Sequence, residues 1–146
     1  MDLFYILLNV LWLLQGDIVE EDGEPTVEVF DIAQERVIFQ GEASQWMQGE
    51  TEEVLQNIDG IYPKVQPIPK DGLLVKMTLE PTIHIENEWL VEWVEEVIFF
   101  YSPEEEPYIL LFDQENHSYF FTIADHDFYM LLNILNSRNT KQSADR

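Results

Sequence analysis

Three short apolar runs in the second half of the chain constrain the fold most. Residues 97–101, 108–112 and 119–123 consist mainly of Val, Ile, Leu, Phe and Tyr, and polar segments with Pro, Glu and Asn separate them. Aromatic and β-branched residues favour strands, and connections of this length favour antiparallel neighbours. The pattern therefore predicts a three-stranded antiparallel meander. Because the runs are almost continuously apolar, both faces of the meander should be buried, by helices or by a partner subunit.

More strands are expected earlier in the chain. Residues 26–32 and 36–41 are rich in Val, Ile and Phe and are joined by a short polar link, which favours a hairpin. Asp71-Gly72 is a turn signal, after which residues 73–79 are expected to form a strand and residues 82–86 a further short strand.

Helices are expected to cover this sheet. Ser44 stands where a helix could begin, but Gly49 interrupts the pattern, so residues 50–57 are the better helical stretch, with Gly60 ending it. A further helix is expected over residues 125–137, with Thr122 or Asp125 near its N-cap.

Residues 88–97 fit two descriptions. Trp89, Trp93 and Val97 recur at helical spacing, whereas the valines and tryptophans also suit a strand; we assign the segment to a helix. The predicted fold class is therefore α+β: an antiparallel sheet, made of an N-terminal hairpin and a C-terminal three-stranded meander, covered by two to four helices.

The length of 146 residues favours a single domain over residues 1–138, followed by a flexible polar tail over 139–146. Three prolines in residues 61–70 exclude a helix or a central strand, so this segment is an extended connector. A division into subdomains would fall there.

The apolar run over residues 3–14 is predicted to be a buried helix or strand. A signal peptide needs a basic start and a small-residue cleavage site, but Asp2 precedes this run and acidic residues follow it. The run also falls short of the roughly 20 residues that cross a bilayer as a helix. Residues 4–11 match residues 128–135 at six of eight positions, which indicates equal roles at the two ends or convergent use of common core residues.

The charge of the chain is its main functional signal. It has 29 acidic against 7 basic residues, a formal net charge of -22, yet 46% of it is hydrophobic and 13% aromatic, so it should fold rather than stay disordered. Residues 77–137 contain 13 acidic residues and no Lys or Arg. The field repels phosphate, so direct binding to nucleic acid or to an anionic membrane is not expected. The lack of cysteine excludes disulfides and thiolate metal sites, and favours a cytoplasmic location.

Two groups of residues are candidates for chemistry. On a strand, His84, Glu86 and Glu88 would share one face and could offer a divalent metal one imidazole and two carboxylates; the alternative is a solvated face. His126 lies between Asp125 and Asp127, as in a general base or metal ligand, but acids at a helix start also serve as caps. No nucleophile elbow, phosphate loop or paired zinc motif is present. We therefore expect a protein that is not an enzyme and needs no cofactor.

The sequence predicts an acidic inhibitor or interaction protein. Its partner would be a basic nucleic-acid-handling protein such as a nuclease, blocked by nucleic-acid mimicry in an anti-restriction, anti-CRISPR or nuclease-immunity setting. The residues expected to bind this partner are the acids and tryptophans of two segments, Glu86, Glu88, Trp89, Glu92, Trp93, Glu95, Glu96, Glu104, Glu105 and Glu106. One alternative is a cytosolic, dimeric acidic chaperone or adaptor that holds an apolar segment against the aromatic meander. Another is an acidic structural protein with no discrete partner.

Overall fold

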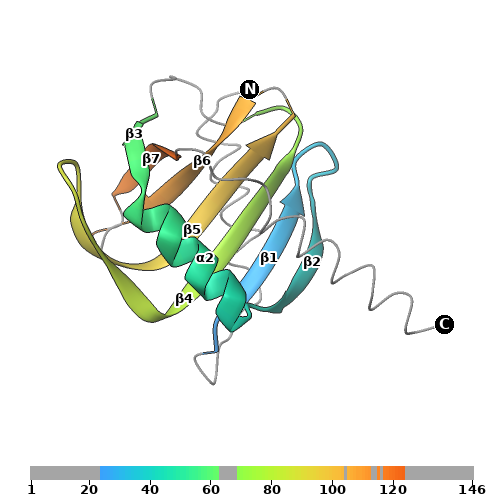
Figure 1. Cartoon of the computed structure of the whole chain (residues 1–146). Helices are drawn as coiled ribbons and strands as arrows, with labels where there is room; N and C mark the ends of the chain where they lie inside the picture. The colour runs from blue at the N-terminus through green and yellow to red at the C-terminus, as the bar shows by residue number, and fades with distance from the viewer. Residues whose placement is uncertain (1–23, 63–68, 104, 113–114, 116, 124–146) are drawn as a thin grey trace.

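The computed structural model describes residues 24–62, 69–103, 105–112, 115 and 117–123, which form a seven-stranded antiparallel sheet and one helix (Figure 1). The elements in chain order are β1 (Thr26–Asp31), β2 (Arg36–Glu42), α2 (Gln45–Gln56), β3 (Ile58–Ile61), β4 (Leu73–Glu86), β5 (Val91–Ser102), β6 (Glu105–Phe112) and β7 (Ser118–Ile123). The strand order across the sheet is β2-β1-β4-β5-β6-β7-β3. No helix within the described ranges is long and apolar enough to span a membrane.

The two local strand units predicted from the sequence are both confirmed. β1 and β2 form an antiparallel hairpin in which Val29 lies opposite Phe39. β5, β6 and β7 form the meander, with Leu110 opposite Ile98 on one side and opposite Phe120 on the other. Both units join segments that are close in the sequence, so turn residues and apolar runs are sufficient to predict their pairing.

β4 joins these two units at the centre of the sheet. It pairs with β1 on one side and β5 on the other, and it merges the two predicted strands into one of 14 residues. The predicted helix over residues 88–97 is wrong, because Val91 onward belongs to β5. The pairing with β4 shifts register between Thr78 and Ile83, so buried positions on β5 do not keep a spacing of two. The spacing of Trp89, Trp93 and Val97 that favoured a helix does not mark one buried face, because Trp89 precedes β5, Trp93 is exposed and Val97 is buried.

α2 begins earlier than predicted. Ser44 is its N-cap and accepts a hydrogen bond at Oγ from the Met47 amide, 3.2 Å away. Gly49 is exposed and has open space around it, so it does not interrupt the helix. The helix ends at Gln56, and Gly60 lies in β3 instead of terminating the helix.

The expected cover of two to four helices is wrong for the described residues, which contain one helix. One of the segments assigned to a helix is a strand. The apolar run 3–14, its similar segment 128–135, the predicted helix 125–137 and the Asp125-His126-Asp127 group all lie outside the described residues. Strands from before and after the connector belong to one sheet, although residues 63–68 of the connector also lie outside.

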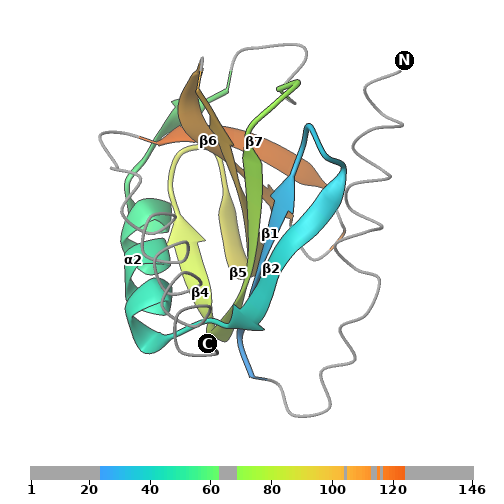
Figure 2. The same cartoon turned by 90° about the vertical axis from the view of Figure 1, so that its right-hand side faces the viewer.

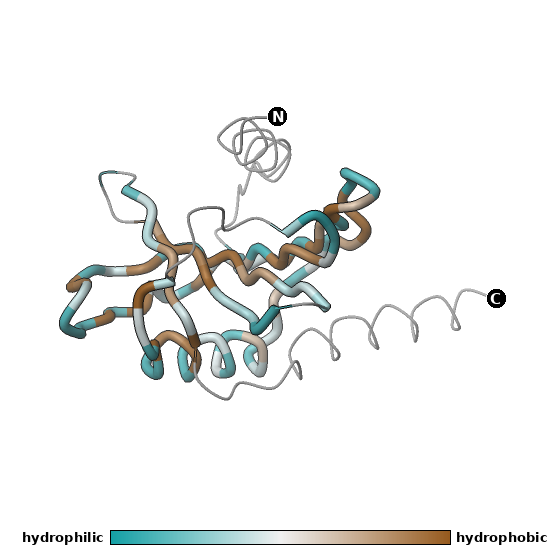
Figure 3. The backbone as a smooth tube through the Cα atoms, turned by 90° about the horizontal axis from the view of Figure 1, so that it is seen from above, coloured by the Kyte–Doolittle hydropathy of each residue, from teal (hydrophilic) through white to brown (hydrophobic). Residues whose placement is uncertain are grey.

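Both faces of the sheet are buried, as the continuous apolar runs predicted. α2 packs across one face, which the edge-on view shows (Figure 2), and it turns its buried residues Met47, Thr51, Val54 and Leu55 toward the strands. The larger apolar cluster lies on this side and includes Val29, Met77 and Phe99. Hydrophobic residues follow the body of the strands, and the hydrophilic residues of α2 lie on its outer side (Figure 3).

α2 also connects the two edges of the sheet. β2 and β3 are the outermost strands, and the helix is the segment between them. Six strand spacings of about 4.8 Å make the sheet roughly 29 Å wide. The 12-residue helix is about 18 Å long, and only Ala43, Ser44 and Asn57 link it to the strands. This leaves little slack, so the helix crosses the strands obliquely from one edge to the other (Figure 1).

Candidate functional site

The distal part of the β4–β5 hairpin carries most of the residues that the sequence analysis singled out. We call residues 79–95 the arm; it comprises the ends of β4 and β5 and the turn between them (Figure 1). β1 pairs with β4 only as far as Met77, and β6 pairs with β5 only from Val97 onward. The arm therefore extends beyond the strands on either side of it.

The turn of the arm is closed by Asn87. Its side-chain Oδ1 accepts hydrogen bonds from the amides of Trp89 and Leu90, each at 2.9 Å. Its own amide donates to the Leu90 carbonyl at 3.0 Å. This is the local side-chain mimicry of a backbone turn for which Asn is favoured. The arm therefore ends in a defined turn.

Two glutamines of α2 hold the arm in place. Gln48 donates to the Thr78 carbonyl at 3.0 Å and accepts from the Glu80 amide at 3.2 Å, so it bridges the point where the register shifts. Gln56 donates to the His84 carbonyl at 3.2 Å. Backbone groups need partners when a ladder is interrupted, and the helix supplies them here.

The two faces of the arm differ in character. Ile83, Ile85, Leu90 and Val94 are buried in the cluster beneath α2. The opposite face carries two register pairs, His84 with Trp93 and Glu86 with Val91. Trp93 is 52% exposed and Val91 62% exposed, and both His84 and Glu86 are exposed. The exposed face therefore combines apolar, aromatic and acidic side chains.

Trp93 contacts the His84 ring through its indole and Glu92 through its backbone amide. The His84 ring lies against it with 4.8 Å between ring centroids and 53° between ring planes. The Trp93 amide donates to Glu92 Oε1 at 3.2 Å. About half of the Trp93 surface still faces solvent. Trp93 is thus a positioned and accessible aromatic residue.

The predicted partner-binding residues separate into distinct groups. Glu86, Glu88 and Glu95 are exposed on the arm, and Glu92 is half-buried there. Trp89 is also half-buried, packs against the core and lies 6.3 Å from the Phe121 ring, so it serves the core. Because Val91–Ser102 is a strand, Glu88, Glu92 and Glu95 do not share one face of a helix.

The remaining predicted acids lie away from the arm. Glu105 and Glu106 begin β6 at the far end of β5, which is roughly 30 Å from Trp93 along the strand. Glu105 accepts a hydrogen bond from the Tyr62 hydroxyl at 3.0 Å, and Glu106 is exposed. Glu104 lies outside the described residues. One continuous binding site containing both acidic segments is therefore not formed by the described residues.

The candidate metal set is not brought together. His84 and Glu86 share the exposed face of β4, as the strand alternation predicted, whereas Glu88 lies in the turn. Within the described ranges, no three or more His, Cys, Asp or Glu side chains form a group that could hold a metal ion.

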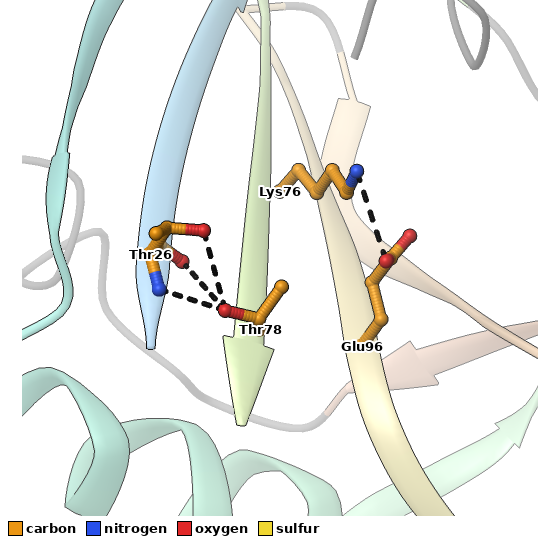
Figure 4. A network of polar contacts seen from close by, with 4 residues as sticks. All are labelled: Thr26, Lys76, Thr78 and Glu96. Carbon is orange, nitrogen blue, oxygen red and sulfur yellow. Dashed lines mark hydrogen bonds and ion pairs between the residues drawn. The ribbon is translucent and has the colours of Figure 1, made fainter. Parts of the chain in front are cut away.

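A buried ionic group is the feature that sequence reasoning missed. Lys76 is 5% exposed near the start of β4, and its Nζ lies 3.7 Å from Glu96 Oε2 on β5 (Figure 4). Glu28, 2% exposed, is the register partner of Lys76 on β1. Thr78 Oγ1 accepts a 2.7 Å hydrogen bond from the Thr26 amide beside this group. The sequence alone does not indicate that Glu28 and Lys76 are buried, because charged residues on strands usually face solvent.

An aromatic stack lies on the same side of the sheet. The Tyr62 and Tyr108 rings stack with 4.0 Å between centroids, and Phe100 stacks on Tyr108 at 4.7 Å. The Tyr108 hydroxyl is buried and has no hydrogen-bond partner. Burial raises the pKa of Tyr108 well above its usual value, and the charges of Tyr62 and Glu105 raise it further; burial likewise raises the pKa of Tyr101.

Comparisons of the chain with models of known protein families, with curated proteins and with solved structures found no match. The functional argument therefore depends on the geometry and charge of the described residues.

Proposed function

We propose that the protein is an acidic inhibitor or interaction protein that binds a basic, nucleic-acid-handling protein at its phosphate-binding surface. Anti-restriction, anti-CRISPR and nuclease-immunity roles are the settings that such mimicry fits, and a cytoplasmic location is part of the proposal. The observation that carries it is the exposed face of the arm. The arm carries the exposed carboxylates of Glu86, Glu88 and Glu95 together with the accessible aromatic residue Trp93, in a region without Lys or Arg.

The described cations do not offset these acids. Lys76 is buried and its ammonium group lies beside Glu96, so its charge is used within the fold. Arg36 on β2 and Lys70 before β4 are the other Lys and Arg of the described ranges, and neither belongs to the arm. The exposed carboxylates of the arm therefore act together on an approaching ligand. Charge of this kind speeds the encounter with an oppositely charged partner and makes the rate dependent on salt.

The aromatic residues of the meander support this proposal over a chaperone. Holding an apolar segment against the meander would require exposed aromatic side chains there. Phe99, Phe100, Tyr108 and Phe121 are each 1% exposed. The exposed large apolar residues of the described part, Trp46, Ile61, Val91 and Trp93, include none from the apolar runs of the meander.

The test compares two variants with equal loss of charge. The arm variant carries Glu86→Gln, Glu88→Gln and Glu95→Gln. The control variant carries Glu35→Gln, Glu52→Gln and Glu53→Gln, which are exposed acids outside the arm. The protein is immobilised, and proteins from a cell lysate are captured on it at about 0.1 M salt. Captured proteins are then eluted with duplex DNA and identified. Finally, the association rate of each identified protein with each variant is measured.

We expect DNA to displace a basic nucleic-acid-binding protein, and the arm variant to bind it more slowly than the control variant does. Three fewer charges change the long-range field equally in both variants, so the difference reports the docking site. A captured protein that ignores both DNA and salt would contradict the proposal. Equal association rates for the two variants would show that the arm is not the docking site.

A further inference from the structure

The exposed face of the arm has the chemistry of a site for one particular side chain. We infer that Trp93 is the docking point for an arginine of the partner, whose guanidinium group stacks on the open indole while the Glu86 carboxylate balances its charge. This inference rests on the proposed function and specifies which group of the basic partner is recognised.

The geometry of the arm favours a cation on Trp93. The indole presents the most favourable aromatic face for cation–π contact, and about half of the Trp93 surface is open. Glu86 lies diagonally across the β4–β5 ladder on the same face, because its register partner Val91 is two residues from Trp93. Diagonal neighbours of this kind are about 7–8 Å apart, within reach of a long side chain. A cation on the indole is therefore also close to a carboxylate.

Arginine fits this surface better than lysine. Its guanidinium group is planar and weakly hydrated, so it can stack on an aromatic ring and still donate hydrogen bonds in its plane to a carboxylate. An ammonium group is compact and strongly hydrated and gains less from the flat indole. Val91, 62% exposed beside the stacked position, would contact the methylene groups of the same arginine.

A second copy of the chain fits the same surface poorly. A stable interface buries about 800 Å² on each partner, whereas Val91 and Trp93 are the exposed large apolar residues of the arm. Two copies would also bring together chains with a net charge of -22 each. Charge complementarity therefore favours a cationic partner on this face.

The His84 ring positions the indole of Trp93 before binding. The His84 ring packs against Trp93 at 4.8 Å, and Glu92 accepts a hydrogen bond from the Trp93 amide. A side chain already held in one orientation loses less conformational freedom when a ligand binds. The indole is thus presented in place instead of being ordered by the partner.

The experiment uses two peptides of equal charge, octa-arginine and octa-lysine, titrated into the full-length protein by calorimetry at about 0.15 M salt. We expect octa-arginine to bind roughly two- to fivefold more tightly, the increment of one exposed cation–π contact. In Trp93→Ala the two peptides should bind equally. Trp93→Phe should keep part of the preference. Trp46→Ala removes another exposed tryptophan, 42% exposed on α2, and should leave the preference intact.

The outcomes separate this inference from the proposed function. Equal binding of the two peptides to the unmodified protein, or a preference that survives Trp93→Ala, would overturn the arginine site. If both peptides still bind in a salt-dependent way, the proposed function stands although the arginine site is refuted. No binding of either peptide at low salt would contradict both. Sedimentation that shows a dimer abolished by Trp93→Ala would assign the surface to a second copy and overturn the inference. Circular dichroism confirms that each variant is folded.

Discussion

Replacing Lys76 with methionine measures what the buried cation contributes to the sheet. Methionine keeps a long apolar side chain but leaves the Glu96 carboxylate without the ammonium charge. Removing one partner of a buried ion pair costs about 3–5 kcal/mol. The Glu96 side chain is 29% exposed and can be partly solvated, so the lower end of that range applies. We expect Lys76→Met to lower the free energy of unfolding by about 3 kcal/mol.

Urea unfolding followed by tryptophan fluorescence is the assay, since its midpoint and slope separate stability from changes in the unfolded chain. A loss of this size lowers the melting temperature by roughly 10 °C for a chain of this length. The control is Lys70→Met, an exposed lysine whose replacement should change stability by less than about 0.5 kcal/mol.

A double variant tests the cause. Glu96→Leu added to Lys76→Met replaces both members of the ion pair with apolar residues on the face of the sheet that carries Leu74 and Ile98. Replacing buried ionic groups with apolar residues of similar volume is often neutral, so most of the lost stability should return. If Lys76→Met is as stable as Lys70→Met, the account of the ionic group is refuted. If the double variant is less stable than Lys76→Met, Glu96 is stabilised by something other than Lys76.

The remaining predictions concern the tyrosines, a glycine and the helix cap. Tyr108→Phe removes a buried hydroxyl without a partner and should raise the free energy of unfolding by about 1 kcal/mol in urea. Because burial raises the pKa of Tyr101 and Tyr108, the unfolded chain loses these protons first as pH rises. Stability is therefore full below about pH 10 and falls above it by about 1.4 kcal/mol per pH unit for each tyrosine, and Tyr108→Phe should reduce this slope in urea melts at successive pH values. Gly72 has φ +118° and an added Cβ would collide with the Tyr101 carbonyl, so Gly72→Ala should cost about 3 kcal/mol by the same assay. Ser44→Ala removes the N-cap of α2 and should cost about 1 kcal/mol, measured as a lower urea midpoint.

The sequence predicted the local parts of the fold and not its long-range pairing. The β1–β2 hairpin and the β5–β6–β7 meander were visible because each joins neighbouring apolar runs through polar turns. β4 was predicted only in two pieces, because its continuity depends on β5 and on the glutamines of α2. The segment 88–97 was assigned to a helix because Trp89, Trp93 and Val97 recur at helical spacing, although Trp93 is exposed and Val97 is buried. Burial on both faces followed from the apolar runs themselves.

Sequence analysis singled out most of the residues of the candidate site but did not predict how they are arranged. Glu86, Glu88 and Trp93 are exposed on the arm, which the acids of this short segment favoured; that they bind a partner stays a prediction. Trp89 could not be separated from Trp93 by sequence alone, since the turn at Asn87 decides which of the two packs against Phe121. Glu96 was counted with the binding acids, but its carboxylate lies beside a lysine that only sheet pairing brings there.

The connection that α2 makes between the two edge strands sets the order in which the strands can pair during synthesis. β1 and β2 can pair as soon as both have left the ribosome, because they are adjacent in the chain. β3 must wait, since its partner β7 begins at Ser118 and is made some 60 residues later. Contacts between distant segments form late because the closing loop must first be ordered. The helix that joins the two edges is therefore translated early and can cross a complete sheet only after the last strand of the meander has emerged.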